Sequence, residues 1–347
     1  MPFARGSVIG GRYTLRRALG EGGVGEVWAA DSALFGPVAV KLLRPEWAKD
    51  AEAVERFAVE ARSAATISHR HVVAIYDIGA TVESVPFFVM ELCEGETLES
   101  TVAARGAVGL EYACELVCQV LAALDAAHSH RIVHRDLKPA NIMVVHPEPD
   151  RPEVKVLDFG IACRARSDES GGGRVFGTPS YMAPEQILGR AVDERTDLYA
   201  AGAILYELLT GRRAFQGRNE AEIMTNVLQR PPMPLRAYDR TLPAAIESLI
   251  RRCLSKDPRQ RPDSAESLRK ELARFLPPPA KNATAAGRER VKSMPLPLVR
   301  RSPGAEEPPS EAVLPLVRRG GTGVPESRRR AVLELVHDTP SHDGDDE

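Results

Sequence analysis

One segment near the middle of the chain, residues 133–145 (VHRDLKPANIMVV), crowds together side chains that could do chemistry. It holds an imidazole, two cations, a carboxylate and an amide, in the order His134, Arg135, Asp136, Lys138 and Asn141. Packing alone does not require this combination of charged and polar side chains in a surface loop. A site that holds a hydroxyl group, a metal ion and a migrating anionic group needs each of these types. The segment is therefore a candidate active site, provided that matching parts occur elsewhere in the chain.

A glycine-rich stretch, residues 19–28 (LGEGGVGEVW), is the first such part, with Gly20, Gly22 and Gly25 between two strand-like segments. Similar glycines occur in a tight hairpin, in a dinucleotide-binding fingerprint and in a flap over phosphates. The fingerprint opens a helix, whereas the residues that follow here have the pattern of a second strand. A phosphate flap is favoured, because glycine lets backbone N–H groups approach an anion closely. The plain hairpin stays an alternative.

Lys41 lies in a strand-like stretch, residues 37–43 (PVAVKLL). A lysine in such a strand is most often a solvated outward side chain. In the helical stretch at residues 50–68, however, Glu60 falls on a face whose apolar residues recur at helical spacing: Val54, Phe57, Ala61 and Ala64. A carboxylate that points inward requires a cation, so we predict a Lys41–Glu60 pair that presents the ammonium group to phosphates.

Composition limits the class of protein. The chain has 347 residues, of which 43% are hydrophobic and 27% charged, and its formal net charge is −2. This length allows one large core or two lobes with a tail, and the charge gives no reason to expect nucleic acid as a partner. The scattered cysteines fit a reducing compartment. Cys114 and Cys118, one helical turn apart, are expected to be buried thiols, with a metal site as the weaker alternative.

The sequence predicts no membrane insertion. Its most apolar run, residues 198–209 (LYAAGAILYELL), is too short to span a bilayer and contains Glu207. The first residues lack the basic and then apolar pattern of a secretory signal. We therefore expect a cytoplasmic location.

Three regimes follow one another along the chain. Residues 12–89 are strand-like around one helix, and residues from about 98 to 275 are mainly helical, with two short strand-like pieces near the start. Residues 277–347 are rich in Pro, Ser, Gly and Arg, and we predict that they are disordered. In this tail LPLVRR occurs twice and LELVHD once, which indicates either low-complexity drift or a repeated docking motif.

Further motifs complete a known order: DFG at 158–160, APE at 183–185, DLYAAG at 197–202 and RP at 261–262. Together with GEGGVG, VAVK and HRDLKPAN, they make the chain resemble the eukaryotic-type serine/threonine protein kinases, most closely their bacterial members, over residues 13–275. The resemblance implies an α+β, bilobal protein kinase fold, with a small strand-rich N-lobe, a larger helical C-lobe and a disordered C-terminal tail. The implied domains are an N-terminal extension (1–11), a kinase domain (12–276, with lobes of about 12–92 and 93–276) and the tail (277–347).

The resemblance also implies roles for the candidate catalytic residues, with ATP and Mg²⁺, or alternatively Mn²⁺, as cofactors. Asp136 would accept or orient the substrate hydroxyl proton, and Lys138 would offset charge at the γ-phosphate. Asn141 and Asp158 would bind the metal ion, and Lys41, fixed by Glu60, would hold the α- and β-phosphates. Lys138 together with Thr178 is typical of kinases that phosphorylate serine or threonine. Protein substrates, including the chain itself, are the expected partners.

The implied nucleotide-binding residues lie in the glycine-rich turn, along the strands around it and in the segment that joins the lobes. They are Leu19, Gly20, Glu21, Gly22, Gly23, Val24, Gly25, Val27, Ala39, Lys41, Met90, Glu91, Cys93 and Met143. Two further matches imply structural roles: Glu185 would pair with Arg261, and Asp197 would anchor the catalytic segment.

Arg135, directly before Asp136, implies regulation by an anion in the segment between DFG and APE. Phosphorylated Ser167 or Ser170 would supply it, or else Asp168 and Glu169 would supply a permanent, weaker charge. Ala140 replaces the glutamate found in many relatives that prefer basic peptides, so the peptide preference stays open. A pseudokinase that binds nucleotide, or a docking protein acting through the tail repeats, is the alternative function.

Overall fold

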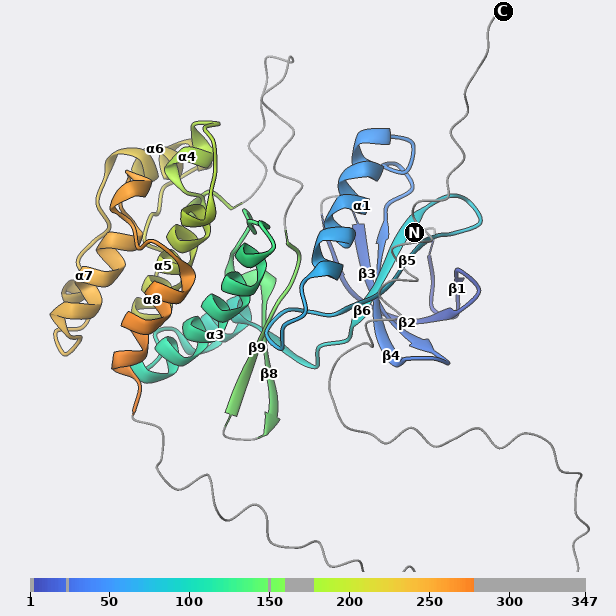
Figure 1. The fold of residues 1–347 in the computed structure, drawn as a ribbon, viewed down its shortest axis with the longest axis horizontal. Helices are drawn as coiled ribbons and strands as arrows, with labels where there is room; N and C mark the ends of the chain where they lie inside the picture. Colours follow the sequence, from blue (N-terminus) through green and yellow to red (C-terminus); the bar gives the residue numbers. More distant parts are fainter. Residues whose placement is uncertain (1–2, 23–24, 149–150, 160–177, 278–347) are drawn as a thin grey trace, which may run out of the picture. The chain divides into compact units, whose positions relative to one another are not determined.

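A computed structural model describes residues 3–22, 25–148, 151–159 and 178–277 of the chain, and Figure 1 shows their fold. The tail that was predicted to be disordered, with its LPLVRR repeats, lies outside the described residues. All the elements below belong to the unit of the chain that contains residues 1–276. Among the helices that the structure describes, none combines the length and the hydropathy that a transmembrane span requires.

The first part of the chain forms an antiparallel sheet of six strands in the order β1-β2-β3-β4-β6-β5. Their bounds are β1 (Val8–Ile9), β2 (Tyr13–Glu21), β3 (Gly25–Ser32), β4 (Gly36–Leu43), β5 (Ile75–Ala80) and β6 (Pro86–Glu91). Strand β1 pairs with β2, so the predicted domain boundary at residue 12 falls between two paired strands. The boundaries themselves stay predictions.

Strand β4 decides where Lys41 points. Side chains alternate between the two faces of a strand. Val38, Val40 and Leu42 accordingly enter one hydrophobic cluster, and Ala39 and Leu43 enter another that also contains Phe57 of helix α1 (Ala51–Thr66). Lys41 has the same parity as Ala39 and Leu43, so the strand period directs its side chain to the face covered by α1.

Helix α1 presents Glu60 to that same face. Asp50 caps the helix by accepting the backbone N–H groups of Glu52 and Ala53 at 3.0 and 3.3 Å. Phe57 packs on Phe88 of β6, with ring centroids 5.0 Å apart. Glu60 is buried together with Ala53, Phe57, Ala61 and Ala64, which confirms the helical face predicted from the sequence, except that Val54 is only partly buried.

The remainder is mainly helical, as predicted, with a small sheet in the order β7-β8-β9 at its start. The strands are β7 (Gly95–Thr97), β8 (Ile142–Glu148) and β9 (Arg151–Val156). The helices are α2 (Leu98–Arg105), α3 (Leu110–Ser129), α4 (Pro184–Ile187), α5 (Glu194–Thr210), α6 (Glu220–Gln229), α7 (Ala244–Cys253) and α8 (Ala265–Leu272).

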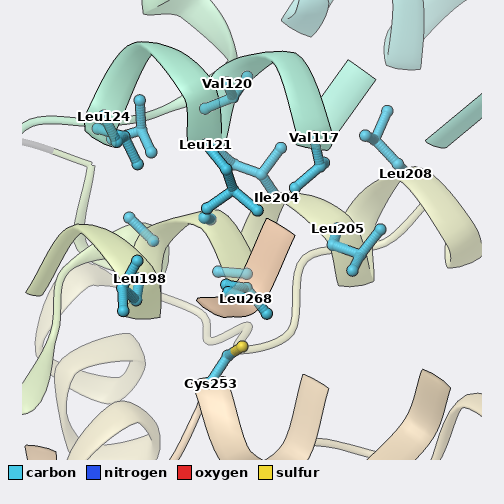
Figure 2. Close-up of a cluster of buried hydrophobic side chains, with 14 of the residues drawn as sticks. Val117, Val120, Leu121, Leu124, Leu198, Ile204, Leu205, Leu208, Cys253 and Leu268 are labelled. Carbon is cyan, nitrogen blue, oxygen red and sulfur yellow. The ribbon is translucent and has the colours of Figure 1, made fainter. Parts of the chain in front are cut away.

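Helix α5 is the centre of this helical part. It is apolar on nearly all sides, a composition that requires burial on every face. Figure 2 shows Val117, Val120, Leu121 and Leu124 of α3 above Leu198, Ile204, Leu205 and Leu208 of α5, with Leu268 of α8 and Cys253 of α7 below. This packing gives the functional residues at the N-terminus of α5 a rigid support.

Candidate active site

The catalytic segment is ordered by its own side chains. Lys138 Nζ donates to Asp136 Oδ2 at 2.7 Å, and Asn141 Nδ2 donates to the carbonyl oxygen and Oδ2 of Asp136 at 2.9 and 3.2 Å. A short 3-10 turn, Pro139–Asn141, brings Asn141 back towards Asp136 and leads into β8. One carboxylate is therefore held by a cation and an amide, with the amide oxygen of Asn141 turned away from it.

Asp197 holds this segment from the first turn of α5. Its Oδ2 accepts the backbone N–H of His134 at 2.8 Å, and its Oδ1 accepts that of Arg135 at 2.9 Å. His128 Nε2 lies 2.8 Å from the same Oδ2. The carboxylate is about 1% exposed, so these partners replace the water it has lost. The predicted anchoring contact of Asp197 is thus present.

The site has two centres: the catalytic segment around Asp136, and a charged cluster of Lys41, Glu60 and Asp158. Lys41 Nζ lies 2.7 Å from Glu60 Oε1 and 2.9 Å from Asp158 Oδ1. Burial alone lowers the pKa of Lys41, but Asp158 and Glu60 outweigh it and raise that pKa. Burial also raises the pKa of Asp158 on its own, yet Lys41 brings it below its usual value. The ammonium and the Asp158 carboxylate therefore stay charged.

Two contacts of the Leu157 backbone bring the two centres together. Leu157 N–H donates to the carbonyl oxygen of Asn141 at 2.8 Å, which places Asp158 beside the catalytic segment. His134 Nε2 lies 3.0 Å from the Leu157 carbonyl oxygen, and the His134 ring packs on Phe159 at 4.8 Å. Both rings are fully buried, which gives them an internal packing role.

The glycine-rich turn joins β2 to β3. Gly22 N–H donates to the carbonyl oxygen of Gly25 at 2.8 Å, and a Cβ atom at Gly25 would lie 2.8 Å from the Leu42 carbonyl oxygen. Only glycine fits this approach without a shift of the backbone. Gly23 and Val24 lie outside the described residues. Since β3 is a strand, the dinucleotide fingerprint is excluded, as predicted.

The predicted adenine contacts lie around the same strands. Ala39 of β4 is paired with Met90 of β6, and both are buried, whereas Val27 and Met143 are partly buried and Leu19 is exposed. Glu91 ends β6, and its carboxylate pairs with Lys155 of β9 at 2.8 Å. Sequence reasoning missed Lys155, because a lone lysine in a strand carries no signal of its partner. Burial raises the pKa of the Cys93 thiol to about 12.

The segment after residue 177 adds two structural contacts. Arg261 binds Glu185 through two parallel bonds, Nη1 to Oε1 at 2.7 Å and Nη2 to Oε2 at 2.8 Å, the pair expected from the sequence. Gln186 Nε2 donates to the carbonyl oxygen of Arg135 at 2.6 Å, a link that no sequence pattern indicated. Thr178 precedes a 3-10 turn, Pro179–Tyr181. Ser167 and Ser170 lie outside the described residues.

The fold and this arrangement define a protein kinase. The chain matches the protein kinase domain family over residues 13–272 and belongs to that family. Membership implies ATP as the nucleotide and proteins as substrates.

Bacterial serine/threonine kinases are among its relatives. The chain is 42% identical over 266 residues to the serine/threonine-protein kinase Pkn1 of Myxococcus xanthus, a match that covers 76% of this chain and 38% of the relative. It is 35% identical over 269 residues to PrkC of Bacillus subtilis, covering 77% and 41%. The solved PknI kinase domain of Mycobacterium tuberculosis matches with a TM-score of 0.63 and 28% identity, over 80% of this chain and 100% of that one. The chain thus spans less than half the length of these two curated relatives.

Proposed function

We propose that this chain is an ATP-dependent kinase that transfers the γ-phosphoryl group to serine or threonine hydroxyls of proteins, including its own. The observation that carries the proposal is the contact of Lys41 with both Glu60 and Asp158, next to the bonded set of Asp136, Lys138 and Asn141. A scaffold that only binds partners has no need to hold these charged groups out of water, which is costly unless they are paired.

Each side chain has a role in the transfer. Asp136, whose carboxylate Lys138 and Asn141 hold in place, orients the acceptor hydroxyl and takes its proton. Lys138 offsets the negative charge that develops on the transferred group, and Lys41 holds the phosphates of the nucleotide. Because Glu60 and Asp158 already hold the ammonium in place, the Lys41 side chain loses little conformational freedom when the nucleotide binds.

The site has donors that fit Mg²⁺. Asn141 Nδ2 donates to Asp136, so the amide oxygen of Asn141 is available as a metal ligand. Asp158 contacts Lys41 through Oδ1, so its Oδ2 is available as a second ligand. Within the described residues, no group of three or more His, Cys, Asp or Glu side chains is placed to hold a metal. Mg²⁺ usually takes one or two protein oxygens together with substrate phosphates, so this donor set suits it. When bound, the ion would neutralise phosphate charge.

Phosphorylation by the purified full chain tests the proposal. With Mg²⁺ and ATP, the wild type should phosphorylate itself or a generic protein on serine or threonine, and a chelator should abolish the transfer. Asp136→Asn should lower the rate by roughly 10²–10⁴-fold, since it removes the proton acceptor. Asp239→Asn, in an exposed loop, is the matched control and should retain full activity. Phosphotyrosine as the main product, or an undiminished rate in Asp136→Asn, would contradict the assignment.

Two further expectations remain hypotheses. A cytoplasmic location is consistent with the free cysteines Cys93, Cys114, Cys118 and Cys253. The second hypothesis is that the tail repeats bind a docking partner. These repeats lie outside the described part of the chain.

A further inference from the structure

The peptide group that joins Arg135 to Asp136 carries the catalytic carboxylate, and it is bound at both of its polar atoms. Its N–H, which belongs to Asp136, donates to the carbonyl oxygen of His134 at 2.9 Å. Its oxygen, which belongs to Arg135, accepts Gln186 Nε2 at 2.6 Å. These two bonds fix the plane of the peptide group, and a side chain from another element supplies the one on the carbonyl side.

Arg135 adopts a strained backbone conformation, with a φ of 66° in the left-handed region that non-glycine residues avoid. Asp197 Oδ1 accepts the Arg135 N–H at 2.9 Å and so restrains rotation about φ. Gln186 binds the carbonyl oxygen at the other end of the residue and so restrains rotation about ψ. Because a rotation about ψ of Arg135 moves Asp136 as a whole, the Gln186 bond affects directly where the catalytic carboxylate points.

A second bond determines the orientation of the Gln186 amide. Its Oε1 accepts the backbone N–H of Ala183 at 3.0 Å, so the amide nitrogen is the atom that faces the Arg135 carbonyl oxygen. Helix α4, which carries Gln186, is itself held in place because Glu185 binds Arg261 through two parallel bonds of 2.7 and 2.8 Å. The donor therefore projects from a well-anchored element.

Asp136 also has partners within its own segment, and these act differently. Lys138 and Asn141 donate to its carboxylate at 2.7 and 3.2 Å, but they lie only two and five residues further along the same turn. Such local bonds order the segment internally and do not fix it relative to the rest of the site. Asp197 of α5 and Gln186 of α4 bind the segment from outside, so they can set its position.

Gln119 of α3 provides an internal comparison. It is partly buried, as Gln186 is, and it makes the same pair of bonds: Nε2 donates to the Pro152 carbonyl oxygen at 3.0 Å, and Oε1 accepts the Val154 N–H at 2.8 Å. Its partners belong to strand β9, whereas those of Gln186 include the residue directly before Asp136. The contribution of such a bond pair to stability can therefore be separated from an effect on the catalytic carboxylate.

We propose that Gln186 is a positioning residue for catalysis: its amide nitrogen holds the Arg135 carbonyl oxygen, so that Asp136 faces the acceptor hydroxyl. The inference rests on the proposed kinase function. Gln186 acts on the transfer step and not on nucleotide binding, because Lys41 is held by Glu60 and Asp158 instead.

The test measures the single-turnover rate at which the full chain phosphorylates a serine peptide at saturating Mg²⁺ and ATP. Gln186→Glu is nearly isosteric and can still accept the Ala183 N–H, but its ionised carboxylate cannot donate to the Arg135 carbonyl oxygen. Gln186→Met removes both bonds without adding a charge. In both variants the rate should fall about tenfold, the scale of one lost hydrogen bond that orients a reacting group. KM for ATP should stay at the wild-type value.

Gln119→Glu and Gln119→Met are the matched controls. Urea denaturation should show that they lose about as much stability as the Gln186 variants, while their single-turnover rate stays at the wild-type value. Three results would overturn the inference: a wild-type rate in Gln186→Glu, an equal loss of rate in the Gln119 variants, or a raised KM for ATP with an unchanged rate in the Gln186 variants. A wild-type chain that phosphorylates neither the peptide nor itself would instead refute the proposed function.

Discussion

Asp197 holds the backbone of Arg135, since its Oδ1 accepts the Arg135 N–H at 2.9 Å. Arg135 has a φ of 66°, in the left-handed region, which costs a non-glycine residue roughly 1–3 kcal/mol. The Asp197 carboxylate compensates for this strain from the first turn of α5, where the helix dipole also stabilises a negative charge. The geometry around Asp136 therefore depends on a residue that never touches the substrate.

Replacing Asp197 should weaken both the fold and the activity. Asp197→Ala leaves the N–H groups of His134 and Arg135 without their acceptor, so we expect a loss of about 2–4 kcal/mol in the free energy of unfolding. Urea denaturation and the phosphorylation rate measure the two effects. Asp193→Ala, which removes the cap of the same helix and a weak, exposed ion pair with Arg195, should cost about 1 kcal/mol and leave the rate intact. Equal effects of the two substitutions would argue against the anchoring role.

Lys41→Met should abolish phosphorylation and also destabilise the protein. It leaves Glu60 and Asp158 facing each other without their cation. We expect a loss of about 2–4 kcal/mol, towards the lower end because Asp158 is partly exposed. Denaturation and an activity assay check this, and Lys49→Met, at an exposed lysine ahead of α1, is the control.

A double variant separates the charge from the catalytic role. Lys41→Met/Glu60→Gln removes the unpaired carboxylate, so it should recover stability relative to Lys41→Met while remaining inactive. If the double variant is less stable than the single one, repulsion between the carboxylates is not the cause of the loss.

Lys256 predicts a pH dependence of stability. Burial lowers its pKa from 10.5 to about 8, with Arg261 contributing, and its Nζ has no hydrogen-bond partner among the described residues. The face of Phe215, 4.1 Å from Nζ, favours the charged form and offsets part of that shift. Between pH 8 and pH 10.5, approximately, the Lys256 ammonium keeps its proton in the unfolded chain but has lost it in the folded chain. Stability contributed by this group therefore rises with pH across that window.

Lys256→Met isolates this contribution, since the variant cannot titrate there. We expect the variant to be more stable than the wild type by about 1–2 kcal/mol at pH 7, with the difference shrinking as the pH rises above about 8. Denaturation curves at several pH values provide the test. Lys270→Met, at an exposed lysine of α8, should show a constant difference instead. A Lys256→Met difference that does not change with pH would contradict the depressed pKa.

Two serines of the segment between DFG and APE, which lie in its part outside the described residues, are expected to control the rate. Phosphate on Ser167 or Ser170 carries more charge and more acceptor oxygens than Asp168 or Glu169. Phosphatase-treated protein and Ser167→Ala/Ser170→Ala should therefore be slow, whereas Asp168→Asn/Glu169→Gln should be nearly as fast as the wild type. Initial rates of peptide phosphorylation decide this. A fast serine variant beside a slow amide variant would indicate a constitutively primed kinase instead.

Local patterns in the sequence were enough to predict much of this protein. Glu60 was expected to point inward because the face of a helix depends only on spacing along the chain. Lys41 was singled out from its strand, and the motif order around Asp136 and Asp158 indicated the kinase class that the fold and the family match show. These features can be predicted from the sequence because each one is a property of a short segment.

Apart from the Lys41–Glu60 and Glu185–Arg261 pairs, only the tertiary structure decided which distant residues meet. The sequence showed Glu207 inside an apolar run, but not that Tyr181 donates to it or that Arg213 returns to it after Gly211. Nor did it show Lys256 above the Phe215 ring. Such contacts depend on the packing of α5 against its neighbours and on the direction in which the chain leaves each helix. Neither is encoded in the periodicity of any one segment, because both follow from how whole elements bury their apolar faces together.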